Sequence, residues 1–303
     1  MKKILITGGT GTIGKKLSQN LSRLGYEVVV LSRNPNSTTK NQLFWDYENK
    51  KMDSDALKNT YALIHLAGTN IGEKRWTEAR KKELIGSRVD SLQFLYKEFE
   101  KINQFPEILI SSSAVGYYGA VTSNKIFTEE NAAAKDFLGQ LCEKWENAAL
   151  HFQEKVKKLV IIRTGVVLSN EKSGALQKML FPFKLGLGSA IGSGKQYLPW
   201  IHIDDIVQQY IFALENGALN GIYNAVAPEH ITNFSFSKKL AKTLKKPFFL
   251  PAIPTFMLKM IFGEMHQIIT EGSRISTKKM ESTGYSFRFP TLEKALKNLL
   301  INE

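Results

Sequence analysis

Apolar and polar residues alternate between two patterns through the first half of the chain. Short, nearly continuous apolar runs predict six β-strands, at residues 4–7, 27–32, 43–45, 62–66, 107–112 and 159–163. Apolar residues recur at helical spacing between these runs and predict a helix that Gly25 ends, followed by helices at residues 77–102 and 136–152. This alternation predicts an α/β fold with a doubly wound, Rossmann-like parallel sheet.

The pattern changes after Arg163. Residues 171–200 are rich in glycine and aromatic residues, which predicts a helix with loops facing a substrate. A helix at residues 204–216 and a strand at 222–226 follow, and the remainder is predicted to be helical except for a strand-like piece at 274–276. We therefore predict a nucleotide-binding domain at residues 1–170, which residues 200–228 rejoin, and a smaller, mainly helical substrate region at residues 171–303.

The turn after the first strand is the most informative segment. Residues 8–14 read Gly-Gly-Thr-Gly-Thr-Ile-Gly, which is G-x-G-x-x-G from Gly9 and opens directly into the first helix. Glycines let a backbone approach phosphates closely, and the free amides of a helix N-terminus face negative charge. The alternative is a glycine-rich turn without a ligand. We predict a diphosphate cradle with contacts from Gly8, Thr10, Gly11, Thr12, Ile13 and Gly14.

The end of the second strand selects between two dinucleotides. An acidic residue about 20 residues past the glycines is typical of NAD(H) binding, because it holds a ribose 2′-hydroxyl. Here Ser32 and Arg33 stand at that position, and a guanidinium suits a phosphate dianion. The cofactor is therefore predicted to be NADP(H), against the alternative of a solvated arginine. Leu66, Ala67 and Gly68 end the fourth strand and are predicted to lie along the same cofactor.

Composition restricts the class of protein and its partners. The 303 residues carry a formal net charge of +13, but the lysines are scattered in pairs without a long basic run, so nucleic-acid binding is not expected. One cysteine excludes an internal disulfide, and no uninterrupted stretch of 18 apolar residues exists. Residues 248–262 are apolar, and we interpret them as core or domain surface rather than membrane. We expect a cytoplasmic monomer or homodimer that takes a small-molecule substrate, with no membrane partner.

Three segments together resemble the extended short-chain dehydrogenase/reductase superfamily, in its NAD-dependent epimerase/dehydratase group. They are residues 8–14, the serines at 111–113, and Trp200-Ile201-His202-Ile203-Asp204-Asp205. Further motifs resemble an atypical subfamily, named after nucleoside-diphosphate-sugar epimerases, with a short C-terminal domain of unknown function: Arg75-Trp76-Thr77, Ser87-Arg88-Val89, residues 113–119, Cys142 with Trp145-Glu146, Arg163-Thr164-Gly165 and Gly192-Ser193-Gly194. The resemblance spans nearly the whole chain and implies the Rossmann-like fold.

The chain departs from that superfamily at its usual proton donor. The superfamily places a Tyr-x-x-x-Lys pair on the helix after the fifth strand, and here Leu138 and Cys142 align with the pair. Ser113 matches the catalytic serine, with a plain strand-terminal serine as the alternative. Tyr117 and Tyr118 are candidates to replace the phenol as general acid, with aromatic packing as the alternative.

Other residues are candidates to line the pocket. Trp76, Trp200 and His202 are assigned to substrate binding, with core packing and a structural histidine as the alternatives, and Asp204 is expected to be a helix N-cap. Arg163 is assigned to cofactor binding. It is also, with Arg75 and Arg88, a candidate for a substrate phosphate or carboxylate, although ion pairing is the usual role. No cluster of histidines and acids has metal-ligand spacing, so no metal is expected.

Two functions remain open. The first is an NADP(H)-dependent oxidoreductase or epimerase-like enzyme acting on an unidentified small substrate, for which a nucleotide sugar is one candidate. The second is a non-catalytic regulator that senses NADP(H). The missing Tyr/Lys pair favours the regulator, whereas the glycine turn and Ser113 fit both. The sequence names neither the substrate nor the proton donor.

Overall fold

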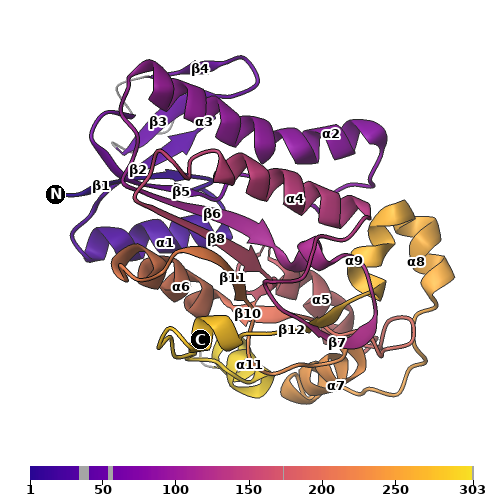
Figure 1. The fold of residues 1–303 in the computed structure, drawn as a ribbon. Coiled ribbons are helices and arrows are strands. Elements are labelled where there is room, and N and C mark those ends of the chain that lie inside the picture. The colour runs from indigo at the N-terminus through magenta and orange to yellow at the C-terminus, as the bar shows by residue number, and fades with distance from the viewer. Residues whose placement is uncertain (34–40, 54–56, 173, 302–303) are drawn as a thin grey trace.

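An eight-stranded sheet forms the centre of the computed structural model, which describes residues 1–33, 41–53, 57–172 and 174–301 (Figure 1). The strand order is β11-β8-β6-β5-β1-β2-β3-β4, and every neighbouring pair is parallel except β3 with β4. The strands are β1 (Lys3–Thr7), β2 (Glu27–Ser32), β3 (Gln42–Asp46), β4 (Lys51–Met52), β5 (Thr60–His65), β6 (Ile108–Ala114), β8 (Lys158–Thr164) and β11 (Gly221–Ala225). The doubly wound sheet expected from the apolar runs is confirmed.

Helices cover both faces of this sheet because successive strand residues point to opposite sides. Ile4 and Ile6 pack toward α1 (Thr12–Arg23) and α6 (Ile203–Glu215), whereas Leu5 faces the other layer. That second layer contains α2 (Glu78–Gly86), α3 (Val89–Lys101) and α4 (Phe137–Leu150). Strands β1, β2, β5 and β8 are therefore buried on both faces over most of their length, which explains why short apolar runs predicted them.

The chain reverses its direction of travel at β1. It runs outward from β1 to β2 and β3, and then returns to the other side of β1 to form β5, β6, β8 and β11. The carboxyl ends of β1 and β5 therefore flank a topological switch point, where open α/β sheets place their ligand crevice. The glycine turn at residues 8–14 begins at this point.

The single helix expected at residues 77–102 is wrong, because the chain forms α2 and α3 with a break between them. The Arg88 amide donates to the Ile85 carbonyl, three residues back rather than four. The Ser87 hydroxyl also donates to the Leu84 carbonyl and competes with the helical pattern. The apolar spacing continues across the break, and periodicity alone does not show it.

The second half contains short elements around two small parallel sheets. Strand β9 (Val166–Leu168) pairs with β10 (Trp200–His202), and β7 (Ser123–Phe127) pairs with β12 (Ser273–Ile275). Only β12 was anticipated, because strands of three to five residues depend on partners distant in sequence. The helical elements are α5 (Ala175–Lys184), α7 (Asn233–Thr243), α8 (Thr255–Phe262), α9 (Gln267–Thr270), α10 (Lys278–Glu281) and α11 (Leu292–Leu300), with 3₁₀ turns η2 (Val115–Tyr118) and η3 (Gly263–His266).

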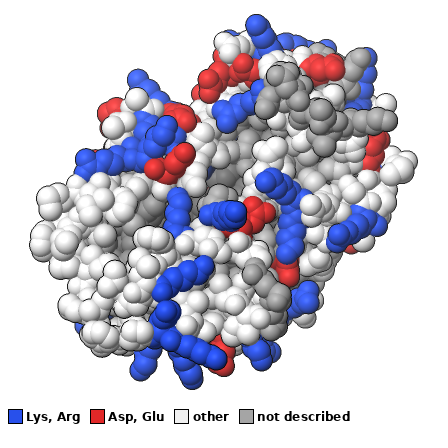
Figure 2. All heavy atoms as spheres, turned by 180° about the vertical axis from the view of Figure 1, so that it is seen from behind, with Lys and Arg blue, Asp and Glu red and all other residues white. Residues whose placement is uncertain are grey.

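The border between the two halves stays a prediction. Strand β11, inside the segment expected to rejoin the first domain, pairs with β8 at the sheet edge. Helices α5, α7 and α8 lie at the opposite end of the molecule from β3 and β4 (Figure 1). Seen from behind, that end presents a broad surface without charged side chains, and lysine or arginine side chains lie below it (Figure 2).

Candidate functional site

The glycine turn packs so closely that three of its positions exclude a side chain. A Cβ on Gly8, where φ is +67°, would lie 2.6 Å from the Leu66 carbonyl oxygen. A Cβ on Gly9 would lie 2.6 Å from the Val30 side chain, and one on Gly14 would lie 2.6 Å from the Gly9 Cα. The turn is closed by the Gly11 amide, which donates to the Gly8 carbonyl at 3.0 Å. These contacts bring β1, β2 and β5 together beneath the start of α1.

Helix α1 begins without a side-chain cap. Its N-cap is Gly11, which has no side chain to cap the helix, and among the described residues no side-chain oxygen accepts from the amides of the first turn. Those amides and the turn itself stand at the carboxyl edge of the sheet, over the switch point. The arrangement fits a diphosphate: the amides supply donors, and the glycines leave room for the backbone to approach an anion. Thr10 and Gly11 are exposed there, and Thr12 is partly exposed.

A threonine and a histidine that the sequence analysis missed hold the cradle from below. The Thr7 hydroxyl accepts from the Leu66 and Ala67 amides, each at 3.1 Å. Its own hydrogen therefore goes to His65 Nδ1 at 2.9 Å, which leaves the other ring nitrogen, Nε2, to donate to the Ser91 hydroxyl at 3.4 Å. Complete burial lowers the pKa of His65 to about 3, so the ring is neutral.

The buried His65 should make stability depend on pH. The unfolded chain binds a proton near the ordinary histidine pKa of 6.5, whereas the folded chain does so only near 3. Stability is therefore complete above pH 6.5 and falls on acidification, by up to about 1.4 kcal/mol per pH unit. We expect urea unfolding of the wild type to lose about 1 kcal/mol more than His65→Gln between pH 7.5 and 5.5. Equal losses in the two proteins would contradict this assignment.

Arg33 lies at the carboxyl edge of the sheet, next to the glycine turn's neighbouring strand. It follows β2 directly and is exposed, and β2 pairs with β1 through Thr7 and Leu31. The described residues at this strand end, Leu31 to Arg33, include no acid. A guanidinium therefore stands where the sequence analysis expected the adenosine ribose. Asn34, which follows Arg33 in the sequence, falls outside the described residues.

A buried polar network lies at the carboxyl ends of β6 and β8, against α4. Arg163 donates from Nε and Nη2 to the two carboxylate oxygens of Glu146, each at 2.8 Å. The Ser113 hydroxyl donates to the same carboxylate at 2.6 Å. Arg163 is 1% exposed, Ser113 2% and Glu146 4%, so this is a desolvated, bidentate ion pair with the serine as third member.

Two tyrosines complete the network. Arg163 Nη1 donates to the Tyr118 hydroxyl at 3.0 Å, and that hydroxyl donates to Asn224 Oδ1 at 2.7 Å. Burial raises the pKa of Tyr118 to about 12, which disfavours it as a general acid. The Tyr117 ring lies over the Arg163 guanidinium at 3.4 Å, and Tyr117 remains partly exposed. Among the described residues, no hydrogen bond involves the Tyr117 hydroxyl.

The structure thus brings the three catalytic candidates together but gives them different roles. The Ser113 hydrogen is directed to Glu146, so toward any ligand this hydroxyl offers lone pairs. Tyr118 is committed inside the protein. Arg163 directs its donors to Glu146, Tyr118 and the Glu129 carbonyl, so its assignment as a direct cofactor contact stays a prediction that this geometry does not support.

The positions of the missing Tyr/Lys pair are filled by apolar packing. Leu138 and Cys142 are both buried on α4, and a Cβ on Gly116 of η2 would lie 3.5 and 3.6 Å from them. Burial raises the pKa of Cys142 to about 12, so the thiol is neutral and no nucleophile. The turn η2 therefore packs directly where longer side chains would project.

Two of the three proposed substrate contacts lie inside the core. Trp200 is fully buried in the cluster between the sheet and α6. His202 accepts from the Asp204 amide at its Nδ1 and pairs through Nε2 with Asn298 of α11, while its ring stacks on Phe289. Burial lowers the pKa of His202 to about 4. His202, not Asp204, is therefore the N-cap of α6, because β10 carries its side chain directly under the helix start.

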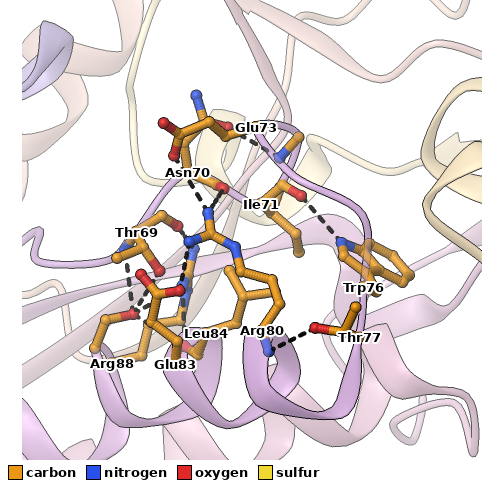
Figure 3. A network of polar contacts seen from close by, with 12 residues as sticks. Thr69, Asn70, Ile71, Glu73, Trp76, Thr77, Arg80, Glu83, Leu84 and Arg88 are labelled. Carbon is orange, nitrogen blue, oxygen red and sulfur yellow. Dashed lines mark hydrogen bonds and ion pairs between the residues drawn. The ribbon is translucent and has the colours of Figure 1, made fainter. Parts of the chain in front are cut away.

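Trp76 belongs to a tightly held segment between β5 and α2 (Figure 3). Its Nε1 donates to the Ile71 carbonyl at 3.0 Å, and Arg80 donates to the Asn70 carbonyl at 2.6 Å and to Glu83 at 2.7 Å. Arg88 donates to the Thr69 carbonyl at 3.0 Å. These bonds hold in place the segment that follows Ala67 and Gly68.

The arginines named as anion binders serve the fold in different ways. Arg75 donates to the Met260 and Ile261 carbonyls at the end of α8. Arg88 also donates to the Leu84 carbonyl, and its guanidinium lies 5.1 Å from the Trp145 ring centre. Burial lowers the pKa of Arg88 to about 10. Arg88 thus bonds to the Leu84 and Thr69 carbonyls and to the Ser87 hydroxyl. Within the part of the chain that the structure describes, no group of three potential metal ligands forms a site.

The amino-acid sequence is similar to known protein families and to individual proteins. Residues 4–225 match the NAD dependent epimerase/dehydratase family, and residues 253–299 match a domain of unknown function, DUF1731. The human epimerase family protein SDR39U1 is 36% identical over 98% of this chain and 99% of its own length, and Bacillus subtilis YfhF is 36% identical over 98% and 97%.

Two solved structures extend the likeness to the fold. The crystal structure of human SDR39U1 (isoform2) with NADPH has a TM-score of 0.88 at 35% identity, and the alignment covers 99% of this chain and 100% of that chain. The nucleoside-diphosphate sugar epimerase from Corynebacterium glutamicum has a TM-score of 0.79 at 30% identity, over 100% of this chain and 59% of that one.

Proposed function

Because the chain belongs to the NAD-dependent epimerase/dehydratase family, we propose that it is an NADP(H)-dependent oxidoreductase or epimerase-like enzyme acting on an unidentified small molecule, with nucleotide sugars as one candidate class. The observation that carries this proposal is the cradle at residues 8–14, in which added Cβ atoms would meet backbone or core, combined with Arg33 where an acid would favour NAD(H). The NADPH in the human relative's structure supports the choice of cofactor.

The residues present fit such a cofactor along the whole crevice. The amides of the turn and of the first turn of α1 would hold the diphosphate, and Arg33 would hold a 2′-phosphate. Leu66, Ala67 and Gly68 would line the middle, and Ser32 would stand beside Arg33. When bound, NADP(H) supplies hydride exchange with a carbon of the substrate.

Ser113 and Tyr117 are the residues proposed to meet the substrate. With its hydrogen held by Glu146, Ser113 would accept a hydrogen bond from a substrate hydroxyl rather than donate one to a carbonyl. Tyr117 would then be the proton donor, because Tyr118 is committed to Asn224. Arg163 acts as a positioning residue in this scheme: it fixes Glu146 and supports the Tyr117 ring.

Removing the Arg33 guanidinium should separate the two dinucleotides. Charge-assisted hydrogen bonds contribute about 1.5–3 kcal/mol, so Arg33→Ala should weaken NADPH binding by about ten- to a hundredfold and leave NADH nearly unchanged. Isothermal titration calorimetry measures the affinities for NADPH and NADH. Arg23→Ala, an exposed arginine at the far end of α1, is the matched control and should change neither. Equal losses for the two cofactors in Arg33→Ala would refute the assignment.

The second candidate function is a non-catalytic NADP(H) sensor, which the apolar Leu138 and Cys142 positions favour. NADPH oxidation against a panel of aldehydes, ketones and nucleotide sugars separates the two. An enzyme should turn over at least one compound and lose that rate in Ser113→Ala and Tyr117→Phe with NADPH affinity retained. Tight NADPH binding with uniform inactivity would support the sensor instead.

A further inference from the structure

Exposed apolar side chains are concentrated in one part of the chain. Of the fifteen large hydrophobic residues that are exposed among the described residues, nine belong to residues 174–203 and 230–263. They are Phe181, Leu185, Leu187, Phe234, Phe249, Phe256, Met257, Met260 and Ile261. Phe249 is 77% exposed and Phe256 67%, which is far from the burial expected of phenylalanine.

The two segments pack against each other and form one surface, which we call the α5–α8 face. Ile191 and Ile253 make a parallel bridge, and the Ile253 amide donates to the Ala190 carbonyl at 2.9 Å. The Ser189 hydroxyl donates to the Pro251 carbonyl at 2.6 Å, and a Cβ on Gly194 would lie 3.0 Å from the Phe234 side chain. The apolar side chains are thus parts of a continuous face.

Helix α8 is held in place from behind, so its outward face is displayed by the fold. Arg75 donates to two carbonyls at the end of the helix, and Lys81 pairs with Glu264 at 2.8 Å just beyond it. Leu258 is buried, and Phe262 packs against the cluster that contains Trp76. Met257 and Met260, on the other side of α8, remain exposed.

The charged residues within these two segments are all basic. Residues 174–203 and 230–263 contain no aspartate or glutamate and nine lysines: Lys178, Lys184, Lys195, Lys238, Lys239, Lys242, Lys245, Lys246 and Lys259. Lys239 pairs with Glu229, just outside the second segment. Much of the net charge of +13 therefore lies around the exposed apolar residues, and Figure 2 shows the uncharged surface at this end with basic side chains below it.

We propose that the α5–α8 face docks on an anionic lipid membrane, with the aromatic and aliphatic side chains entering the interface and the lysines contacting lipid headgroups. Apolar side chains surrounded by lysine are the combination that binds such an interface. A second copy of the chain fits poorly, because a two-fold contact would bring like charges together. No helix of the described chain is long and apolar enough to cross a bilayer, so docking would be peripheral.

This inference is independent of the cofactor and differs from the sequence-based expectation of no membrane partner. That expectation came from the absence of an 18-residue apolar run, a criterion for spanning helices only. Residues 248–262 were expected to be core or domain surface, and the structure shows several of their large side chains exposed on the surface. Short apolar pieces from α5, α7 and α8 become one face only after folding.

Vesicle co-sedimentation of the full chain tests the proposal. Wild type should bind vesicles containing phosphatidylglycerol and should bind pure phosphatidylcholine vesicles at least about tenfold more weakly, with the difference shrinking at high salt. Phe256→Ser with Met260→Ser, and separately Lys242→Glu with Lys246→Glu, should each lower partitioning about tenfold or more. Thermal unfolding by circular dichroism verifies that each variant is folded.

Matched pairs elsewhere on the surface serve as controls. Leu24→Ser with Ile126→Ser removes exposed apolar groups, and Lys97→Glu with Lys144→Glu changes charge equally on α3 and α4. Both should stay within about twofold of wild type. No binding of folded wild type to anionic vesicles, or equal losses in the control pairs, would overturn the proposal. Vesicle binding that only the lysine pair reduces would also overturn it, since a surface that recognises an acidic protein partner would behave in that way. A dimer of the wild type that Phe256→Ser with Met260→Ser dissociates would show instead that the face contacts a second copy of the chain.

Discussion

Replacing Arg163 by methionine is expected to destabilise the protein by about 3–5 kcal/mol, the largest stability effect that the structure predicts. The substitution keeps most of the apolar volume but leaves the Glu146 carboxylate buried, with the Ser113 hydroxyl as its one remaining donor among the described residues. Both members of the pair are nearly inaccessible to water, so solvent cannot replace the two lost hydrogen bonds. Urea unfolding at pH 7.5 measures the difference.

Two further variants establish that the cost comes from an uncompensated charge. Arg288→Met removes an exposed arginine near Asp204 and should cost at most about 1 kcal/mol, since exposed pairs are worth little. Arg163→Met combined with Glu146→Met removes both charges and should recover much of the loss, because apolar replacements of whole buried pairs are often tolerated. A loss below about 1 kcal/mol in the single variant would show that the pair is weakly coupled.

Local patterns were sufficient to predict most of the parallel sheet. Strands β1, β2, β5 and β8 are buried on both faces over most of their length, so a short apolar run identifies each of them without knowledge of its partners. The spacing of the glycines also identified the turn after β1, but the reason that Gly8 and Gly9 exclude side chains lies in Leu66 and Val30, which only the fold brings to the turn. The diphosphate site itself stays a prediction.

The polar network was harder to predict because its members come from separate elements. Glu146 lies on α4, whereas Ser113 and Arg163 end two strands, and the sequence treated these three residues as separate features. The available signal was the type of residue: Ser113 and Arg163 are polar positions at the ends of apolar strands, and Glu146 follows Trp145 on the buried side of its helix. Buried polar groups need partners, so three of them near one sheet edge point to a shared contact.

The same reasoning explains two residues that the sequence analysis assigned differently or missed. His202 was assigned to substrate, yet its two ring nitrogens are used by the Asp204 amide and by Asn298, which is 96 residues away in sequence. Thr7 was read as the last strand residue, although its hydroxyl organises the ends of β1 and β5. Side-chain hydrogen bonding across such distances depends on topology, which residue spacing does not encode.

Gly14→Ala should weaken NADPH binding about a hundredfold, the largest binding effect expected here. The added methyl group would displace the backbone amides that would hold the diphosphate. Gly14 lies in α1 with an ordinary helical backbone, so alanine alone would favour the helix by about 1 kcal/mol. Its Cβ would nevertheless lie 2.6 Å from the Gly9 Cα and closer still to the Gly8 carbonyl oxygen. Both obstacles are backbone, so the turn and the helix must move apart, and overpacking of this kind costs about 1–3 kcal/mol.

Gly217→Ala is the matched control for Gly14→Ala, because a Cβ there meets nothing within 4 Å and φ is not left-handed. It should leave both NADPH affinity and stability nearly unchanged, or raise stability by a few tenths of a kcal/mol. Calorimetric titration of the two variants, with urea unfolding of each, separates loss of the cradle from loss of the fold. Wild-type NADPH affinity in a folded Gly14→Ala protein would exclude the cradle at residues 8–14 as the diphosphate site, because the clash cannot be relieved without moving that turn.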